Sequence, residues 1–119
     1  MLVLEESQAV DDEFRVETFA AGDGALGLRV HGELDTATAD QLVDAVESWP
    51  DRPTSCVVDL HNCEFLDSSG IRALLLCQRA LDGGAGMLRL VGVRPHIDRV
   101  LRIAGVQTVL ELGSVDGDS

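Results

Sequence analysis

The sequence predicts an α/β fold built on a mixed β-sheet, with elements in the order β-β-α-β-α-β-α-(β). Two neighbouring segments near the start alternate apolar and polar residues, which is typical of a β-hairpin. Strand-like and helix-like patterns then follow one another to the end, as in parallel strands joined by helical crossovers. The 119 residues, 45% of them hydrophobic, suffice for one domain with one core. We therefore expect a sheet with a hairpin at one edge and helices packed against it.

The hairpin is predicted by period-two alternation in residues 14–18 and 26–30, with a turn at the glycines of 22–24. Residues 22–27 also match GxGxxG letter for letter. A dinucleotide site needs that run to leave a strand and open a helix, whose N-terminus then holds the pyrophosphate. Here a strand pattern follows, so the run is interpreted as a glycine-rich hairpin turn.

Residues 36–48 switch to helical spacing, with Asp35 or Thr36 able to cap the start and Pro50 stopping continuation. One face of this segment carries Ala39, Leu42, Val43 and Val46. Residues 56–60, CVVDL, then form a short run with β-branched residues. Such a run is typical of a strand buried on both faces.

A second helix is predicted after residues 67–70, DSSG, and the pair Gly83-Gly84 ends it. Its apolar face carries Ile71, Leu74, Leu75 and Leu81. A strand over 87–93 follows, and then a third amphipathic helix in whose first turn Pro95 is tolerated. Gly105 is the predicted C-cap of that helix. A last short strand is expected over 108–112.

The composition indicates the limits of the domain and the cellular compartment. Residues 1–11 form an acidic lead-in, 12–112 the domain, and 113–119 a flexible tail. The start of the chain lacks the positive charge of a signal peptide, and the apolar run 73–77 is too short to span a bilayer. Three cysteines without CxxC spacing do not make a disulfide framework. We expect a cytoplasmic protein.

The net charge narrows the choice of partners. Nine arginines face 21 acidic residues, for a formal charge of -12. This field repels nucleic-acid phosphates and anionic membranes, so neither is an expected partner. The negative charge has two interpretations of equal weight. It only keeps the protein soluble, or it favours partners with basic patches.

A metal site and a hydrolase site are the catalytic alternatives. His61, Cys63 and Glu64 lie close together in the sequence. A structural zinc site requires four ligands with recognisable spacing, so the segment is interpreted as a loop with a half-buried thiol. Ser68 could be a nucleophile, with a histidine at 31, 61 or 96 as base. The chain has neither a GxSxG elbow nor an evident oxyanion arrangement. We expect no enzyme activity and no metal.

The DSSG stretch is a convincing helix cap. Asp67 can accept hydrogen bonds from the first free amides of the helix. Ser68 then falls in the exposed first turn, near the positive end of the helix dipole, and Gly70 leaves the approach open. Capping needs only one such residue, so it does not explain the second hydroxyl at Ser69 or the glycine.

Three segments together resemble the STAS domain, and more narrowly the bacterial anti-sigma factor antagonists. They are GELD at 32–35, VVDL at 57–60 and FLDSSG at 65–70. Pro95, the helix after it and Gly105 also fit that pattern. The resemblance covers about residues 12–112.

The resemblance implies a switch protein without catalysis of its own. Ser68 would be phosphorylated by an anti-sigma factor with serine kinase activity, and Asp35 and Asp67 match positions that contribute to kinase recognition. Ser69 and Gly70 complete the implied partner-binding set. The unphosphorylated form would bind the anti-sigma factor and free a sigma factor, and a metal-dependent serine phosphatase would reset the switch. ATP and its metal would belong to the kinase, so this chain needs no cofactor.

The electrostatics of the switch follow from the charge of a phosphate. It adds about -1.5 to -2 charges, and the helix dipole favours it by about 0.3–1 kcal/mol. Asp67 is adjacent, and Asp35 comes close if both helix-opening loops lie at one end of the sheet. We expect phosphorylation to leave the fold intact and to weaken binding at the docking face. A coupling of about 1–3 kcal/mol between phosphorylation and partner binding would change the affinity by about 5–150-fold. The alternative role is a constitutive STAS docking subunit of a transporter or stress-signalling complex.

Overall fold

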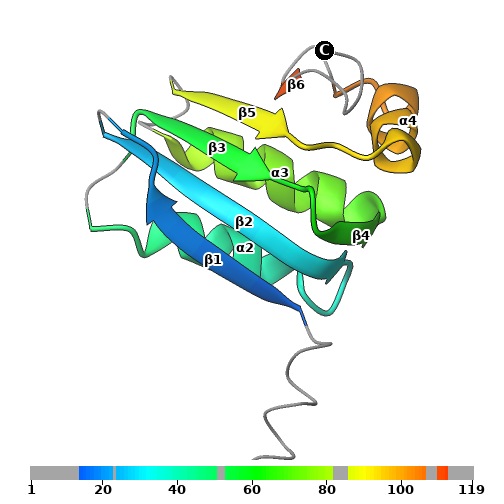
Figure 1. Ribbon diagram of the computed structural model, residues 1–119, viewed down its shortest axis with the longest axis horizontal. Helices are drawn as coiled ribbons and strands as arrows, with labels where there is room; N and C mark the ends of the chain where they lie inside the picture. Colours follow the sequence, from blue (N-terminus) through cyan, green and yellow to red (C-terminus); the bar gives the residue numbers. More distant parts are fainter. Residues whose placement is uncertain (1–13, 23, 51–52, 82–85, 107–109, 113–119) are drawn as a thin grey trace, which may run out of the picture.

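The computed structural model describes residues 14–22, 24–50, 53–81, 86–106 and 110–112 (Figure 1). The expected lead-in at 1–11, the tail at 113–119 and Gly83-Gly84 lie outside the described residues. The elements in chain order are β1 (Arg15–Ala20), β2 (Ala25–Leu34), α2 (Ala39–Glu47), β3 (Ser55–Asp59), β4 (Cys63–Leu66), α3 (Ser68–Ala80), β5 (Met87–Val91), α4 (Pro95–Ile103) and β6 (Glu111–Leu112).

The sheet is mixed, as predicted. Its strands run in the order β1-β2-β3-β5-β6, with β1 and β6 at the edges. The pair β1–β2 is antiparallel and forms the hairpin, whereas β2–β3, β3–β5 and β5–β6 are parallel. The long strand β2 pairs with β3 along Ala25–Arg29 and with β4 along Gly32–Leu34. Strand β4 thus extends the parallel pairing of β2 beyond the end of β3.

The predicted order lacked strand β4. Along this strand Cys63 and Leu66 are buried while Glu64 and Phe65 between them are exposed, so period-two alternation is lost. The pairing with β2 also shifts register between Gly32 and Glu33. A bulge of this kind breaks the side-chain pattern by which short strands are recognised.

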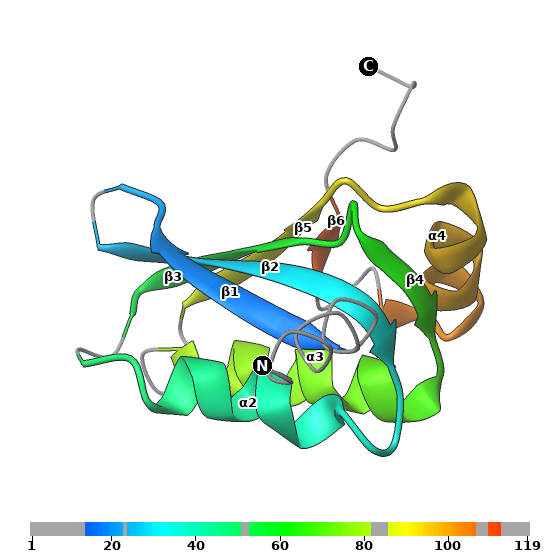
Figure 2. The same ribbon diagram turned by 60° about the horizontal axis from the view of Figure 1, so that its bottom comes forward.

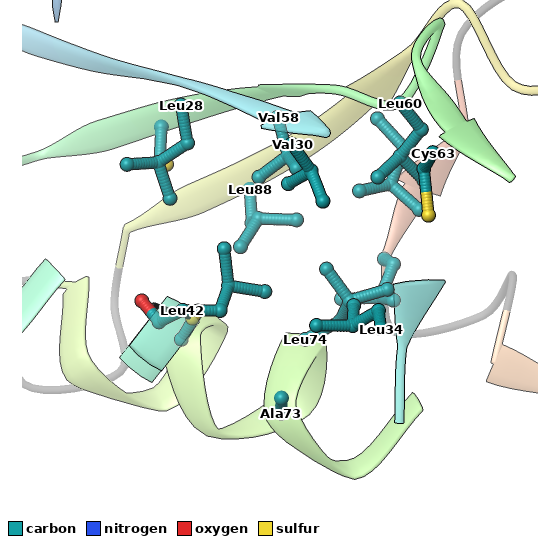
Figure 3. Packing of buried hydrophobic residues seen from close by; sticks show 14 of the residues in the cluster. Leu28, Val30, Leu34, Leu42, Val58, Leu60, Cys63, Ala73, Leu74 and Leu88 are labelled. Carbon is teal, nitrogen blue, oxygen red and sulfur yellow. Dashed lines mark hydrogen bonds between the residues drawn. The ribbon is translucent and has the colours of Figure 1, made fainter. Parts of the chain in front are cut away.

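Helices α2 and α3 lie side by side on one face of the sheet, and α4 packs near β4 (Figure 2). The core fills the space between that face and the two helices (Figure 3). Strand residues and helix residues meet there with essentially no exposed surface, among them Leu28, Val30, Val58, Leu88, Leu42 and Leu74. Burying each such side chain stabilises the fold by about 1.5–3 kcal/mol.

No helix in the described part of the chain covers the opposite face of the sheet, so the expectation that the central strand is buried on both faces was wrong. Cys56 and Val58 of β3 are buried, but Val57 and Asp59 point the other way and are half-buried. On this open face Arg29 lies over the Phe19 ring, with its guanidinium carbon 4.8 Å from the ring centroid. Arg29 also lies 3.5 Å from a carboxylate oxygen of Glu17 and 3.5 Å from one of Asp59, so ion pairs lie on this side of the sheet.

The ends of the elements follow the sequence at some positions and depart from it at others. Gly22 and Gly24 adopt φ of +97° and +82°, which confirms the hairpin turn, and the chain enters β2 rather than a helix. Pro95 opens α4, and Gly105, with φ of +77°, follows the C-cap. Helix α2 begins at Ala39 and not at 36, and its N-cap residue makes no side-chain capping bond.

Candidate functional site

Two aspartates lie together at the carboxyl edge of the sheet. Leu34 of β2 pairs with Leu66 of β4 in parallel register, and Asp35 and Asp67 are the next residues of the two strands. The Asp67 N–H donates to the Leu34 carbonyl oxygen at 3.4 Å. The expectation that both helix-opening loops lie at one end of the sheet is confirmed.

Asp67 caps helix α3, as predicted. Its backbone is extended, with φ of -115°, and its Oδ1 accepts hydrogen bonds from the Ser69 N–H at 2.9 Å and the Gly70 N–H at 3.2 Å. The Asp67 carbonyl oxygen accepts from the Ile71 N–H at 3.0 Å. The carboxylate is therefore held in place by the backbone of the first helical turn.

The two serines of the stretch have different environments. Ser68, the first residue of α3, is exposed, and its side chain makes no hydrogen bond to any residue that the structure describes. Ser69 is half-buried, and its Oγ lies 2.9 Å from the Oγ1 of Thr36. The free hydroxyl is thus that of Ser68.

The Thr36–Ser69 hydrogen bond joins the loop before α2 to the first turn of α3, across 33 residues of sequence. The sequence does not predict this hydrogen bond, because the position of Thr36 suggests only a cap for its own helix. Asp35 organises the same loop instead, since its Oδ1 accepts from the Ala37 N–H at 3.0 Å. The Thr38 hydroxyl accepts from the Asp35 N–H at 2.9 Å and lies 2.8 Å from the Glu33 carbonyl oxygen.

Gly70 has a different role from the one predicted. It is buried, and a Cβ there would lie 2.7 Å from the Leu34 carbonyl oxygen and 3.0 Å from the Cγ atoms of Leu34 and Leu66. The glycine therefore lets α3 approach the end of β2 closely. It does not keep the solvent side of the turn open, and it presents no side chain to a partner.

Two grooves flank this edge of the sheet. One of about 310 Å³ lies between α2 and α3, and its lining comprises Thr36, Ala39, Asp40, Val43, Ser69, Arg72, Ala73 and Leu76. The other, of about 610 Å³, contains three acidic residues, Glu33, Asp35 and Glu64, and three basic ones, Arg15, His31 and Arg94. The exposed Ser68 hydroxyl and the aspartates thus lie among recesses that a partner protein could enter.

The residues considered for metal binding point in different directions. Cys63 is fully buried rather than half-buried, and its thiol lies 3.4 Å from the Phe65 carbonyl oxygen, while Glu64 is exposed. Burial raises the pKa of the Cys63 thiol. Within the described ranges, no three His, Cys, Asp or Glu side chains are grouped to hold a metal ion.

Two of the three histidines considered as bases have other partners. His31 Nε2 lies 3.1 Å from a Glu17 carboxylate oxygen. His96 Nε2 lies 2.9 Å from the Glu64 carbonyl oxygen. Neither of these hydrogen bonds involves Ser68.

A comparison with protein families gives a match over residues 17–112 to the model described as "Mlab, STAS domain". The chain belongs to the STAS domain family. A STAS-domain containing protein of Pseudomonas aeruginosa is 28% identical over 73% of this STAS domain chain and 86% of its own length. The anti-sigma F factor antagonist of Paenibacillus polymyxa is also 28% identical, over 75% of this chain and 78% of its own.

Solved structures support the same assignment. An anti-sigma factor antagonist from Mycobacterium paratuberculosis superposes with a TM-score of 0.72 at 28% identity, covering 90% of this STAS domain chain and 91% of its own. A sulfate transporter family protein from Wolinella succinogenes gives a TM-score of 0.67 at 20% identity, over 77% and 75% of the two chains. That second likeness shows the fold alone. In the part of this chain that the structure describes, no helix has the length and apolarity to cross a bilayer.

Proposed function

We propose that this STAS domain is an anti-sigma factor antagonist whose binding is switched by phosphorylation of Ser68. In its unphosphorylated form it binds an anti-sigma factor with serine kinase activity and so releases a sigma factor. The observation that carries the proposal is the free, exposed hydroxyl of Ser68 in the first turn of α3, beside Asp67 and close to the loop of Asp35. Relatives that are anti-sigma factor antagonists support the role.

In the proposed reaction this chain supplies only the acceptor. The Ser68 Oγ attacks the γ-phosphorus of ATP, the O–H bond breaks, an Oγ–P bond forms, and ADP and a proton leave. ATP, its metal ion and the base belong to the kinase, so the domain is not an enzyme and carries no cofactor. A metal-dependent serine phosphatase hydrolyses the phosphate ester with water and restores the hydroxyl. With these partners, the proposed place of action of the domain is the cytoplasm.

The docking face changes because the neighbouring charges are fixed. The Asp67 carboxylate is held by two backbone amides and the Asp35 carboxylate by its own loop, so neither can easily turn away from a new phosphate. A phosphate carries about -1.5 to -2 charges, and it would repel an acidic group of the partner or crowd a tight interface. The cap itself is untouched, so the fold persists. A coupling of about 1–3 kcal/mol corresponds to a change in affinity of about 5–150-fold.

The direct test incubates the chain with its candidate kinase and ATP and maps the product by mass spectrometry. Phosphate is expected on Ser68 in the wild type and in Ser69→Ala, and none on Ser68→Ala. No phosphate on residues 68–69 in the presence of an active kinase would refute the switch. Ser68→Ala is also expected to bind the anti-sigma factor more tightly than Ser68→Asp, and equal affinities would contradict the electrostatic account.

A pull-down from cell extract distinguishes this proposal from a constitutive docking role. Recovery of an ATP-binding kinase is the expected result. Recovery of transporter or stress-signalling components without such a kinase would replace the switch with a role as a docking subunit.

A further inference from the structure

A cation lies one helical turn from the proposed phosphorylation site. Ser68 and Arg72 stand at positions i and i+4 of α3, and both are exposed. Residues with this spacing are neighbours on one helix face, with Cβ atoms about 5–6 Å apart. An anion on the N-terminal side of a cation is also the more favourable order for such a pair. A phosphate on Ser68 would therefore lie within reach of the Arg72 guanidinium.

Among the backbone amides of the first turn of α3, the groups that usually bind an anion at a helix N-terminus, only the Ser68 N–H has no partner among the described residues. The Ser69 and Gly70 N–H groups donate to the Asp67 carboxylate, and the Ile71 N–H donates to the Asp67 carbonyl oxygen. Beyond the single N–H of Ser68, a phosphate there must compete with this cap or find its donors elsewhere. Arg72 is the nearest basic side chain along the helix that can supply them.

Arg72 is available for this role. Its side chain makes no hydrogen bond or ion pair with any residue in the described part of the chain. It lines the groove between α2 and α3, where Asp40 lies on the side of α2. The carboxylates placed at this position by the chain and the sheet register are those of Asp67, next to Ser68, and of Asp35, at the paired end of β2. Arg72 is thus the one basic residue in the first two turns of α3, whereas Arg15, His31 and Arg94 line the separate groove that contains Asp35.

We infer that Arg72 is the intramolecular ligand of the phosphate on Ser68, an inference that rests on the proposed function. In the unphosphorylated domain the guanidinium stays in the α2–α3 groove, where an acidic group of the partner can pair with it. In the phosphorylated domain it pairs with the phosphate through charge-assisted hydrogen bonds. Phosphorylation then alters the docking face twice, because it adds an anion and withdraws a cation.

The test places phosphoserine at position 68 of the full chain by genetic encoding and follows its titration by ³¹P NMR. Three proteins are compared: the otherwise wild-type chain, Arg72→Gln and Arg79→Gln. Arg79 is exposed on the same helix, eleven residues from the phosphate, so its variant changes the net charge equally without touching the pair. Asp35, Asp40 and Asp67 are the same in all three.

The guanidinium favours the dianion, so the second pKa of the phosphoserine is expected to be lower by about 0.2–0.7 in the wild type than in Arg72→Gln. Arg79→Gln is expected to match the wild type. Equal values in all three proteins, or equal shifts in both variants, would overturn the assignment of Arg72. The titration uses no kinase, so its result stands even if the kinase assay gives no phosphate on Ser68. Conversely, equal phosphoserine pKa values in the three proteins would not contradict Ser68 as the phosphate acceptor.

Discussion

Replacing Gly70 by alanine tests how closely helix α3 must approach strand β2. The nearest atom to the new Cβ is a backbone oxygen, that of Leu34 at 2.7 Å, with the Cγ atoms of Leu34 and Leu66 at 3.0 Å. Side chains can rotate away from a clash, but a carbonyl in a paired strand end cannot. The same carbonyl also accepts the Asp67 N–H, so a retreat of α3 weakens that hydrogen bond as well.

The expected loss follows from two opposing effects. Overpacking of this kind costs about 1–3 kcal/mol, while alanine gains about 0.5–1 kcal/mol over glycine in helix propensity. The net decrease in the free energy of unfolding is about 1–2 kcal/mol. For a domain of this size it lowers the melting temperature by about 4–8 °C.

Urea unfolding monitored by circular dichroism measures the difference. Ser69→Ala is the matched control, because it changes the adjacent residue of the same turn and adds no atom. It is expected to lose less than about 1 kcal/mol, from its hydrogen bond to Thr36. A Gly70→Ala variant as stable as the wild type would show that α3 can move off β2 without cost, and would refute the packing argument.

Three further predictions concern the cap, the interloop bond and the thiols. Asp67→Ala is expected to lower the free energy of unfolding by about 1 kcal/mol, whereas Asp67→Asn is expected to preserve it because asparagine caps equally well. Urea unfolding curves that rank the two variants otherwise would contradict the capping role of Asp67. In a double-mutant cycle, Thr36→Val and Ser69→Ala should couple by about 0.5–1 kcal/mol, and strict additivity would count against their hydrogen bond. Burial raises the pKa of Cys56 to about 12 from 9.0, so the folded state keeps a proton that the unfolded state loses, and stability is expected to fall as the pH rises from 9 toward 12. The chain has no lysine or tyrosine to titrate in that range, so urea midpoints independent of pH there would contradict the burial of the thiols.

Local patterns allowed most of the fold to be predicted. The hairpin turn requires positive φ at Gly22 and Gly24, which only glycine adopts readily, and the Asp67 cap depends on residues within three positions. Contacts between distant segments were beyond such patterns. Strand β4 owes its existence to pairing with β2, and the Thr36–Ser69 hydrogen bond depends on how α2 and α3 pack.

The site was predicted in part for the same reason. That Asp35 and Asp67 meet could be anticipated from parallel strands sharing a carboxyl edge. The reason for Gly70 could not, because in the sequence a glycine beside two serines looks like a means of access. Only the position of the Leu34 carbonyl oxygen shows that it serves packing.

The two edges of the sheet bear on how the domain behaves at high concentration. An unpaired strand edge is a template on which a second chain can add, and short or charged edge strands are the usual protection. Strand β6 has only two residues, and β1 carries Arg15 and Glu17 as an ion pair at 3.4 Å. Edge-to-edge growth into fibrils is disfavoured at both ends. The short β6 and the charged β1 thus protect the sheet against self-association by strand addition.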